Sequence, residues 1–196
     1  GDVRSAVVVI GDLQSPRFVR QLALFVRKVE AVKGREAEDD PQSRISFEDD
    51  RFCEDVIGGR DVPAGRDHAA ECDRDLCVSD LAWRLRQLGV RIGSDPSGEL
   101  LIRDASGGVG AVIEVAAGTG MPLLEQAVGR LMLRGASLPR DTRRWLVAPG
   151  DPGEDLARGL AALGIRFIPF GWEAGQAVFA GLAGQLAEMG DAKASG

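Results

Sequence analysis

Residues 98–134 decide the fold, and they read GELLIRDASGGVGAVIEVAAGTGMPLLEQAVGRLMLR. Two runs of aliphatic and β-branched residues, 99–103 and 111–116, are separated by a turn with three glycines, a pattern that predicts a β-hairpin with a longer loop. Glycines and a proline then break the chain. Apolar residues at helical spacing follow, and they predict a helix over 123–133.

Two carboxylates mark this hairpin. Glu99 opens its first strand, and Glu114 interrupts the otherwise apolar second strand, Ala-Val-Ile-Glu-Val-Ala. An unpaired carboxylate in a buried strand is costly, because the charge loses its hydration. Carboxylates on neighbouring antiparallel strands can converge on one divalent cation, which removes this cost. The pair therefore predicts a metal site.

With these residues the chain resembles the PD-(D/E)XK phosphodiesterases, the restriction-endonuclease-like nucleases. That family carries an acid at the head of one strand, Glu-x-Lys on the next strand, and then a helix that often contains Gln-Ala-x-Gly. The matching positions are Glu99, Glu114 and residues 126–130, and Ala116 occupies the place of the lysine. The resemblance covers roughly residues 75–170, and motifs this short are moderately specific.

The resemblance implies an α/β fold with a restriction-endonuclease-like core, and a metal-dependent nuclease activity. A Mg2+ or Mn2+ ion would polarise the phosphoryl oxygen and activate the attacking water. Gln126 and Arg130 lie four residues apart on one helical face, where they would contact the active site or simply solvate the helix. The implied catalytic positions are Glu99, Glu114, Ala116, Gln126 and Arg130, and the implied metal ligands are Glu99 and Glu114 with Asp80, Asp95 or Asp104.

Ala116 separates the chain from the family pattern, because alanine can neither position water nor stabilise developing charge. Three explanations are open: a deliberate lysine-to-alanine replacement, transfer of the lysine's role to Arg130, or a domain that binds without cutting. The resemblance thus implies a nuclease that is inactive or impaired in this form. The alternative is a catalytically dead module for binding nucleic acid or protein.

Arginines are concentrated in the predicted helix and just before the strand that follows it. The bidentate guanidinium suits phosphate contacts, so these residues predict nucleic acid as a partner, with DNA favoured over RNA. The net charge of −6 weighs against general nucleic-acid binding, but a polyanion meets the local surface. A homodimer or a protein partner is also open. The basic residues are Arg130, Arg134, Arg140, Arg143 and Arg144.

All three cysteines and the single histidine fall between residues 53 and 77. Thiolate and imidazole ligands suit a structural zinc ion, and Cys53, His68, Cys72 and Cys77 supply the four that such a site needs. Their spacing lacks a CxxC pair, however. The other interpretation is that these are ordinary buried or free residues in a long irregular connection.

The N-terminal part predicts a strand over 6–10 and a helix over about 16–35, capped by Ser15. Cations outnumber acids along this helix, which indicates a solvated surface or a phosphate-contacting helix. The acid-rich residues that follow, 36–55, are typical of a linker, with an autoinhibitory nucleic-acid mimic as the alternative.

The remaining pattern completes an α/β order of elements. Helices are expected over 75–88, 154–163 and 173–189, and strands over 90–93, 143–148 and 165–170. The expected organisation is a strand–helix element (1–35), an acidic irregular linker with the Cys/His cluster (36–74), the nuclease-like core (75–190) and a tail (191–196).

The absence of a signal peptide or a membrane-length apolar run predicts a cytoplasmic protein with no membrane partner. Two other classes of function are open. One is a scaffolding module that binds protein partners. The other is a nucleotide-binding domain, although both phosphate-loop patterns, GxGxxG and GxxxxGK[ST], are missing.

Overall fold

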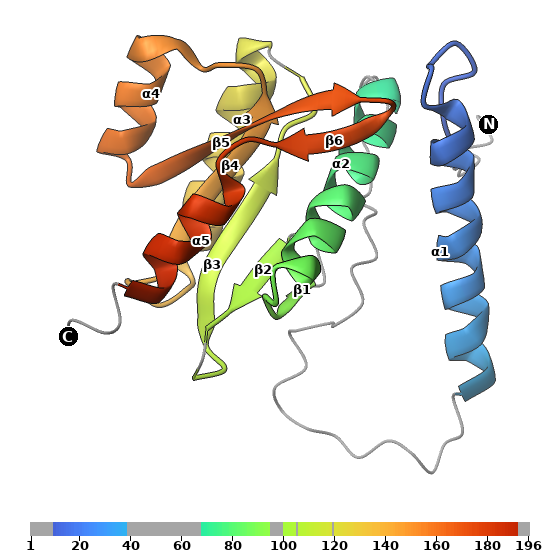
Figure 1. The fold of residues 1–196 in the computed structure, drawn as a ribbon, viewed down its shortest axis with the longest axis horizontal. Coiled ribbons are helices and arrows are strands. Elements are labelled where there is room, and N and C mark those ends of the chain that lie inside the picture. Colours follow the sequence, from blue (N-terminus) through green and yellow to red (C-terminus); the bar gives the residue numbers. More distant parts are fainter. Residues whose placement is uncertain (1–9, 39–67, 95–99, 105, 119, 192–196) are drawn as a thin grey trace, which may run out of the picture.

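The computed structural model describes residues 10–38, 68–94, 100–104, 106–118 and 120–191. Within these residues the chain forms an α/β fold, in which helices cover a six-stranded mixed sheet (Figure 1). The strands lie side by side in the order of the sequence. The sheet consists of β1 (Ile92–Ser94), β2 (Leu100–Arg103), β3 (Val109–Val115), β4 (Arg143–Pro149), β5 (Ile165–Glu173) and β6 (Gln176–Phe179).

The direction of each strand follows from the length of its connection. Strand β2 pairs antiparallel with β1 and with β3, and β5 pairs antiparallel with β6. Strands β3, β4 and β5 run parallel, so each of the two connections must cross back over the sheet. Helix α3 (Met121–Ala136) makes the first crossover and α4 (Gly153–Ala162) the second.

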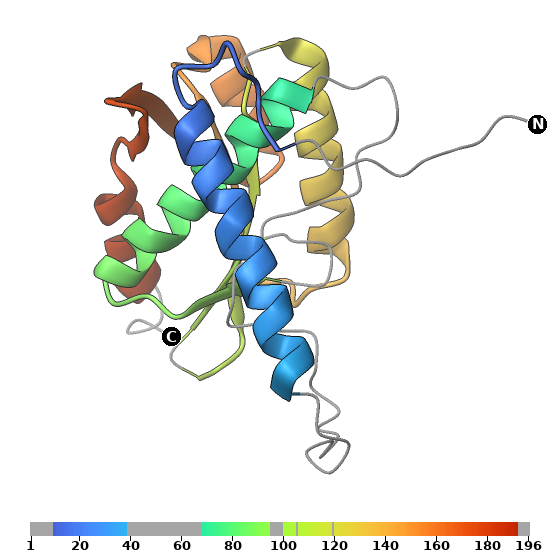
Figure 2. The same cartoon turned by 90° about the vertical axis from the view of Figure 1, so that its right-hand side faces the viewer.

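Two apolar cores lie on the two faces of the sheet. Residues of α2 (His68–Gln87) and Leu182 of α5 (Leu182–Asp191) pack on one face, whereas α3 and α4 pack on the other. Helix α1 (Phe18–Glu38) lies outside α2 and crosses it (Figure 2). Among the α1 residues whose side chains are described, none belongs to either core.

The alternation of β3 assigns its side chains to these two faces. Ile113 and Val115 belong to the core beneath α2, and Val112 and Ala116 belong to the core beneath α3. Because residues two apart on a strand share a face, Glu114 points toward α3 together with Ala116. The shared face of Glu114 and Ala116 is thus as the sequence predicts.

Two boundaries differ from the sequence-based expectation. Helix α2 begins at His68 rather than at residue 75, so the final part of the expected linker is helical. Helix α1 continues to Glu38, through residues to which the sequence analysis assigned no helix. Helical hydrogen bonds persist there although Gly34 lowers the helix propensity. The strand expected over 6–10 lies outside the described residues.

The expected helix over 173–189 is wrong in its first half. Strand β5 continues to Glu173, and the chain turns back through Ala174 and Gly175 into β6. Both turn residues have positive φ, 48° and 80°, as a two-residue hairpin of the I′ kind requires. The sequence feature that predicts this hairpin is an Ala-Gly pair between two segments in which apolar and polar residues alternate. The apolar content of the region made a helix the expected structure instead.

No helix in the described part of the chain is long and apolar enough to cross a membrane. The longest helix in the described residues, α1, is amphipathic and rich in charged residues.

Asp80 joins three elements, and its removal should destabilise the fold. The residue is 8% exposed. Its carboxylate accepts a hydrogen bond from the Ala177 N–H of β6 at 2.8 Å and forms an ion pair with Arg20 of α1 at 2.6 Å. Asp80→Ala leaves both donors without their acceptor, so we expect a loss of about 2–4 kcal/mol in the free energy of unfolding. Urea denaturation measures this change.

Asp155→Ala is the matched control, because Asp155 is exposed and its salt bridge to Arg158 lies on the surface of α4. An equal loss of stability in the two variants would contradict the structural role of Asp80.

Candidate functional site

The most unusual side chain in the sheet is that of Glu114. It is 1% exposed and lies on β3, between β2 and β4, among apolar neighbours. Its Oε1 accepts hydrogen bonds from Arg130 Nε at 3.0 Å and from Arg130 Nη2 at 2.6 Å. The guanidinium therefore neutralises a carboxylate that burial would otherwise destabilise.

Helix α3 delivers Arg130 to this position. Leu124, Ala127 and Leu131 form the buried stripe of the helix and fix its rotation on the sheet. Arg130 lies at the border of this stripe, with its side chain 26% exposed. The guanidinium can therefore reach Glu114 from the helix while part of the arginine faces solvent. Gln126, one turn earlier, is half-buried and also makes a polar contact.

Ala116 lies two residues beyond Glu114 and is 5% exposed. Its N–H donates to the Val147 carbonyl of β4 at 2.9 Å, so the parallel pairing extends to this residue. The side chain belongs to the apolar core beneath α3. A longer side chain at this position would have to extend along the end of the sheet.

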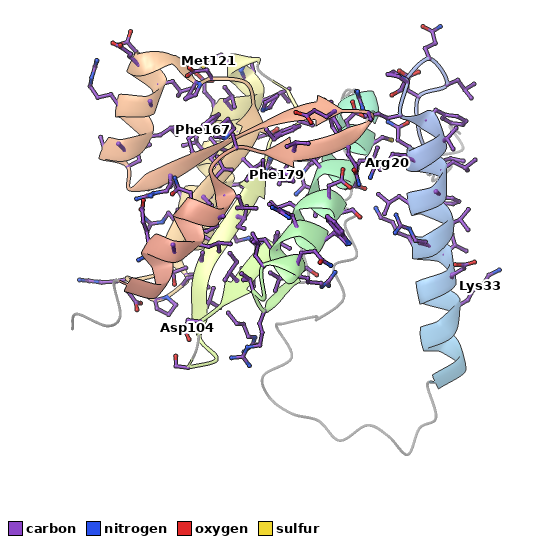
Figure 3. All side chains as sticks on the ribbon, in the orientation of Figure 1. Arg20, Lys33, Asp104, Met121, Phe167 and Phe179 are labelled. Atoms are coloured by element: carbon purple, nitrogen blue, oxygen red, sulfur yellow. The ribbon has the colours of Figure 1, made fainter. Side chains whose placement is uncertain are left out.

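The described metal-ligand candidates do not lie together. Asp80 belongs to α2, on the face of the sheet opposite Glu114, and is paired with Arg20. Asp104 accepts hydrogen bonds from the Ser106 and Gly108 N–H groups in the turn before β3. Figure 3 shows Asp104 at the lower end of the sheet, far from Arg20. The turn and the helix therefore hold these two carboxylates away from Glu114.

The proposed metal site depends on residues that the structure does not describe. Glu99 and Asp95 lie outside the described residues, so their convergence with Glu114 stays a prediction. Within the described ranges, no group of three or more His, Cys, Asp or Glu side chains is arranged to hold a metal ion.

The zinc candidates are only partly described. Cys72 and Cys77 lie on α2, five residues apart and therefore on different sides of the helix, and Cys77 is packed in the apolar core. His68 begins the same helix, whereas Cys53 lies outside the described residues. The four-ligand site stays a prediction, and the helix does not bring its two described thiols to one side.

The predicted basic surface is divided by the sheet. Arg143 and Arg144 are consecutive in β4 and therefore point to opposite faces. Arg143 Nη2 donates to the Glu188 carbonyl of α5 at 3.0 Å, whereas Arg144 packs so closely on Gly135 of α3 that a Cβ there would collide with its guanidinium. Arg130 is engaged with Glu114. Of the remaining two, Arg134 is half-buried and Arg140 exposed.

Sequence reasoning missed Arg74, a buried cation on α2. The residue is 4% exposed, and its Nε donates to the Val115 carbonyl at 3.2 Å. Its Nη1 lies 3.6 Å from Asp75 Oδ1 and has no hydrogen-bond partner in the described part of the chain. The helix was expected to begin after Arg74. Extending its apolar stripe, Val78, Leu81 and Leu85, backward by one turn would have placed Arg74 on the buried side.

No protein-family model matches this sequence, and no match is found among the curated proteins or the solved structures. The resemblance to the nuclease superfamily therefore depends on the residues themselves, Glu99, Glu114 and the helix segment 126–130, and Ala116 departs from it. What it implies for activity is treated below as a proposal.

The Glu114–Arg130 pair should be strongly coupled. Arg130→Met keeps most of the side-chain length but removes the guanidinium from a buried carboxylate, so we expect a loss of about 3–5 kcal/mol in the free energy of unfolding. Adding Glu114→Leu should recover most of this loss, because the buried charge that lost its guanidinium partner is then removed. Urea denaturation of the two single variants and the double variant gives the coupling energy.

Arg158→Met is the control, since Arg158 forms an exposed salt bridge. Additive effects of the Glu114 and Arg130 changes would contradict the coupling.

Cys77 should resist alkylation in the folded protein. Burial raises the pKa of the Cys77 thiol well above its usual range, and the nearby Asp80 carboxylate adds to the shift. The nucleophilic thiolate is therefore scarce. We expect iodoacetamide at pH 8 to leave Cys77 unmodified in native protein and to modify it in urea, as measured by peptide mass spectrometry. Rapid native modification would contradict the packing of α2.

Proposed function

We propose that this chain is a nucleic-acid-binding domain of the PD-(D/E)XK, restriction-endonuclease-like type, whose cleavage is impaired because Ala116 stands where the family has lysine. The observation that carries the proposal is a buried glutamate on the third strand of an antiparallel meander. The order of elements from α2 to β4 supports it: a helix, three antiparallel strands, a crossover helix and a parallel strand. The family resemblance rests on the same elements.

The chemistry implied is metal-assisted phosphodiester hydrolysis. A bound Mg2+ or Mn2+ ion supplies Lewis-acid polarisation and an activated water when it is present. Among the described residues, Glu114 offers the hard oxygen ligand that such an ion prefers. Glu99 is the second predicted ligand, and its contribution is part of the proposal.

Two features of the chain would weaken this reaction. Arg130 already neutralises Glu114 through Oε1, so a metal ion must compete with the guanidinium for the charge of this carboxylate. Ala116 supplies no ammonium group to stabilise the charge of the transition state. Loss of one preorganised group of this kind costs about 10²–10³ in rate. Weak, metal-dependent cleavage is therefore expected rather than efficient turnover.

A second candidate is a module that binds nucleic acid or protein without any cleavage. The Glu114–Arg130 pair favours it specifically, because an internal cation occupies the role that a metal ion would have. The two candidates differ in their response to divalent metal. The impaired nuclease needs the metal for cleavage, and the binding module is indifferent to it.

Ala116→Lys should restore or raise cleavage. A lysine at this position shares the face of Glu114, so its ammonium can approach a phosphate group that is bound beside this carboxylate. We expect the rate of cleavage of labelled DNA and RNA in Mg2+ or Mn2+ to rise about 10²–10³-fold. The lysine also enters a position that is 5% exposed, so folding of each variant must be checked by thermal unfolding.

Ala116→Met is the matched control for the added side-chain volume, and Glu114→Gln is the blank for the carboxylate. If Ala116→Lys cleaves no better than Ala116→Met on any substrate while both remain folded, the nuclease proposal fails. Nucleic-acid binding without cleavage would then favour the second candidate.

A further inference from the structure

Helix α1 is attached to the rest of the molecule mainly by charge. Arg17 donates from Nε and Nη2 to the two carboxylate oxygens of Asp73, at 2.9 and 2.5 Å. Lys28 pairs with Asp75 at 2.6 Å, and Arg20 pairs with Asp80. In each of these three pairs α2 supplies the anion, and the cation comes from α1 or from Arg17, the residue directly before it.

The apolar residues of α1 contribute little to this attachment. Val19, Leu22 and Val26 are 77%, 39% and 46% exposed, and no α1 residue whose side chain is described belongs to either apolar core. Phe18 and Phe25 are half-buried, and the Arg17 guanidinium lies 4.4 Å from the centre of the Trp172 ring. The docking of α1 is thus a set of polar contacts rather than an extension of the core.

The contacts that hold α1 are of the kind that a phosphate can replace. Arg17 binds Asp73 through two parallel hydrogen bonds, and a guanidinium can bind a phosphate group in the same bidentate way. Lys28 meets a single carboxylate oxygen, as it would meet a phosphate oxygen. Further along the helix, Arg27 and Lys33 are exposed, and Figure 3 shows Lys33 pointing away from α2.

We propose that the docking of α1 on α2 is an autoinhibitory contact, in which Asp73 and Asp75 hold Arg17 and Lys28, which otherwise bind the phosphates of nucleic acid. The inference rests on the proposed function, since it assigns the regulation and one binding surface of the same domain. Nucleic acid and the aspartates compete for these two cations. By linkage, whatever weakens the docking strengthens nucleic-acid binding, up to the affinity of the fully released helix.

Asp73 is the residue that tests this competition most cleanly. Its carboxylate accepts hydrogen bonds from Arg17 and from Gln21 of α1. Asp80 is unsuitable because it also accepts the Ala177 N–H. Asp75 is unsuitable because it also lies 3.6 Å from the buried Arg74 guanidinium.

The experiment compares Asp73→Asn with Asp155→Asn in the full chain. Both changes remove one negative charge, but only the first removes an acceptor that α1 uses. We expect Asp73→Asn to bind a fluorescein-labelled 20-base-pair DNA about fivefold more tightly than the wild type by fluorescence anisotropy. Asp155→Asn should change the affinity less than twofold. Ionic strength is held constant, because it alters both contacts.

Two further measurements identify the mechanism. Hydrogen–deuterium exchange of α1 should be faster in Asp73→Asn without DNA, because the helix is then released more often. Adding Arg17→Gln to Asp73→Asn should abolish the gain in affinity, because Arg17 is the cation that was released.

The outcomes separate the inference from the function on which it rests. Equal affinities for Asp73→Asn and Asp155→Asn, or a gain that survives Arg17→Gln, overturn the autoinhibitory contact while nucleic-acid binding stands. Failure of the wild type and of both variants to bind DNA or RNA at low salt overturns the binding function, and the inference falls with it.

Discussion

The buried ion pair between Glu114 and Arg130 is the interaction on which the centre of the structure depends. The carboxylate lies on β3 where that strand pairs in parallel with β4, and the guanidinium lies on the helix that connects these two strands. A buried charge in this position needs a partner of opposite charge. Removing a carboxylate from water without such a partner costs more free energy than most single contacts contribute. The pair therefore couples the rotation of α3 to the register of β3, beyond what the apolar stripe of α3 alone would specify.

Charge organises the periphery of the molecule as well. The two apolar cores hold the sheet between its covering helices, whereas α1 is attached to carboxylates of α2 through Arg20 and through Arg17, the residue before the helix. Asp80 links both systems, since it accepts a backbone N–H of β6 and a guanidinium of α1. Apolar burial has no charge for salt to screen, whereas these part-buried ion pairs are screened to the extent that solvent reaches them. The core and the docked helix should thus respond differently to ionic strength.

Much of the central architecture is visible in the sequence. The glycine-bounded hairpin, the helix after it and the alternation of strands and helices all depend on local periodicity, which one sequence contains. The expected helix over 173–189 failed because the chain direction was set by two residues, Ala174 and Gly175, whose positive φ reverses the strand. The partner of Glu114 could not be inferred either. The sequence indicated that a cation was required, but the pairing with Arg130 depends on how α3 lies on the sheet.

The two members of the central pair differ in their freedom to move. Glu114 is 1% exposed and is fixed by a strand paired on both sides, so its carboxylate cannot leave the interior without breaking the sheet. The side chain of Arg130 is 26% exposed, on the border between the buried and solvated sides of α3. Rotation about its side-chain bonds can carry the guanidinium toward water while the helix backbone remains in place. A cation that takes the place of the guanidinium at Oε1 must therefore displace Arg130, and it must do so on the α3 side of the sheet.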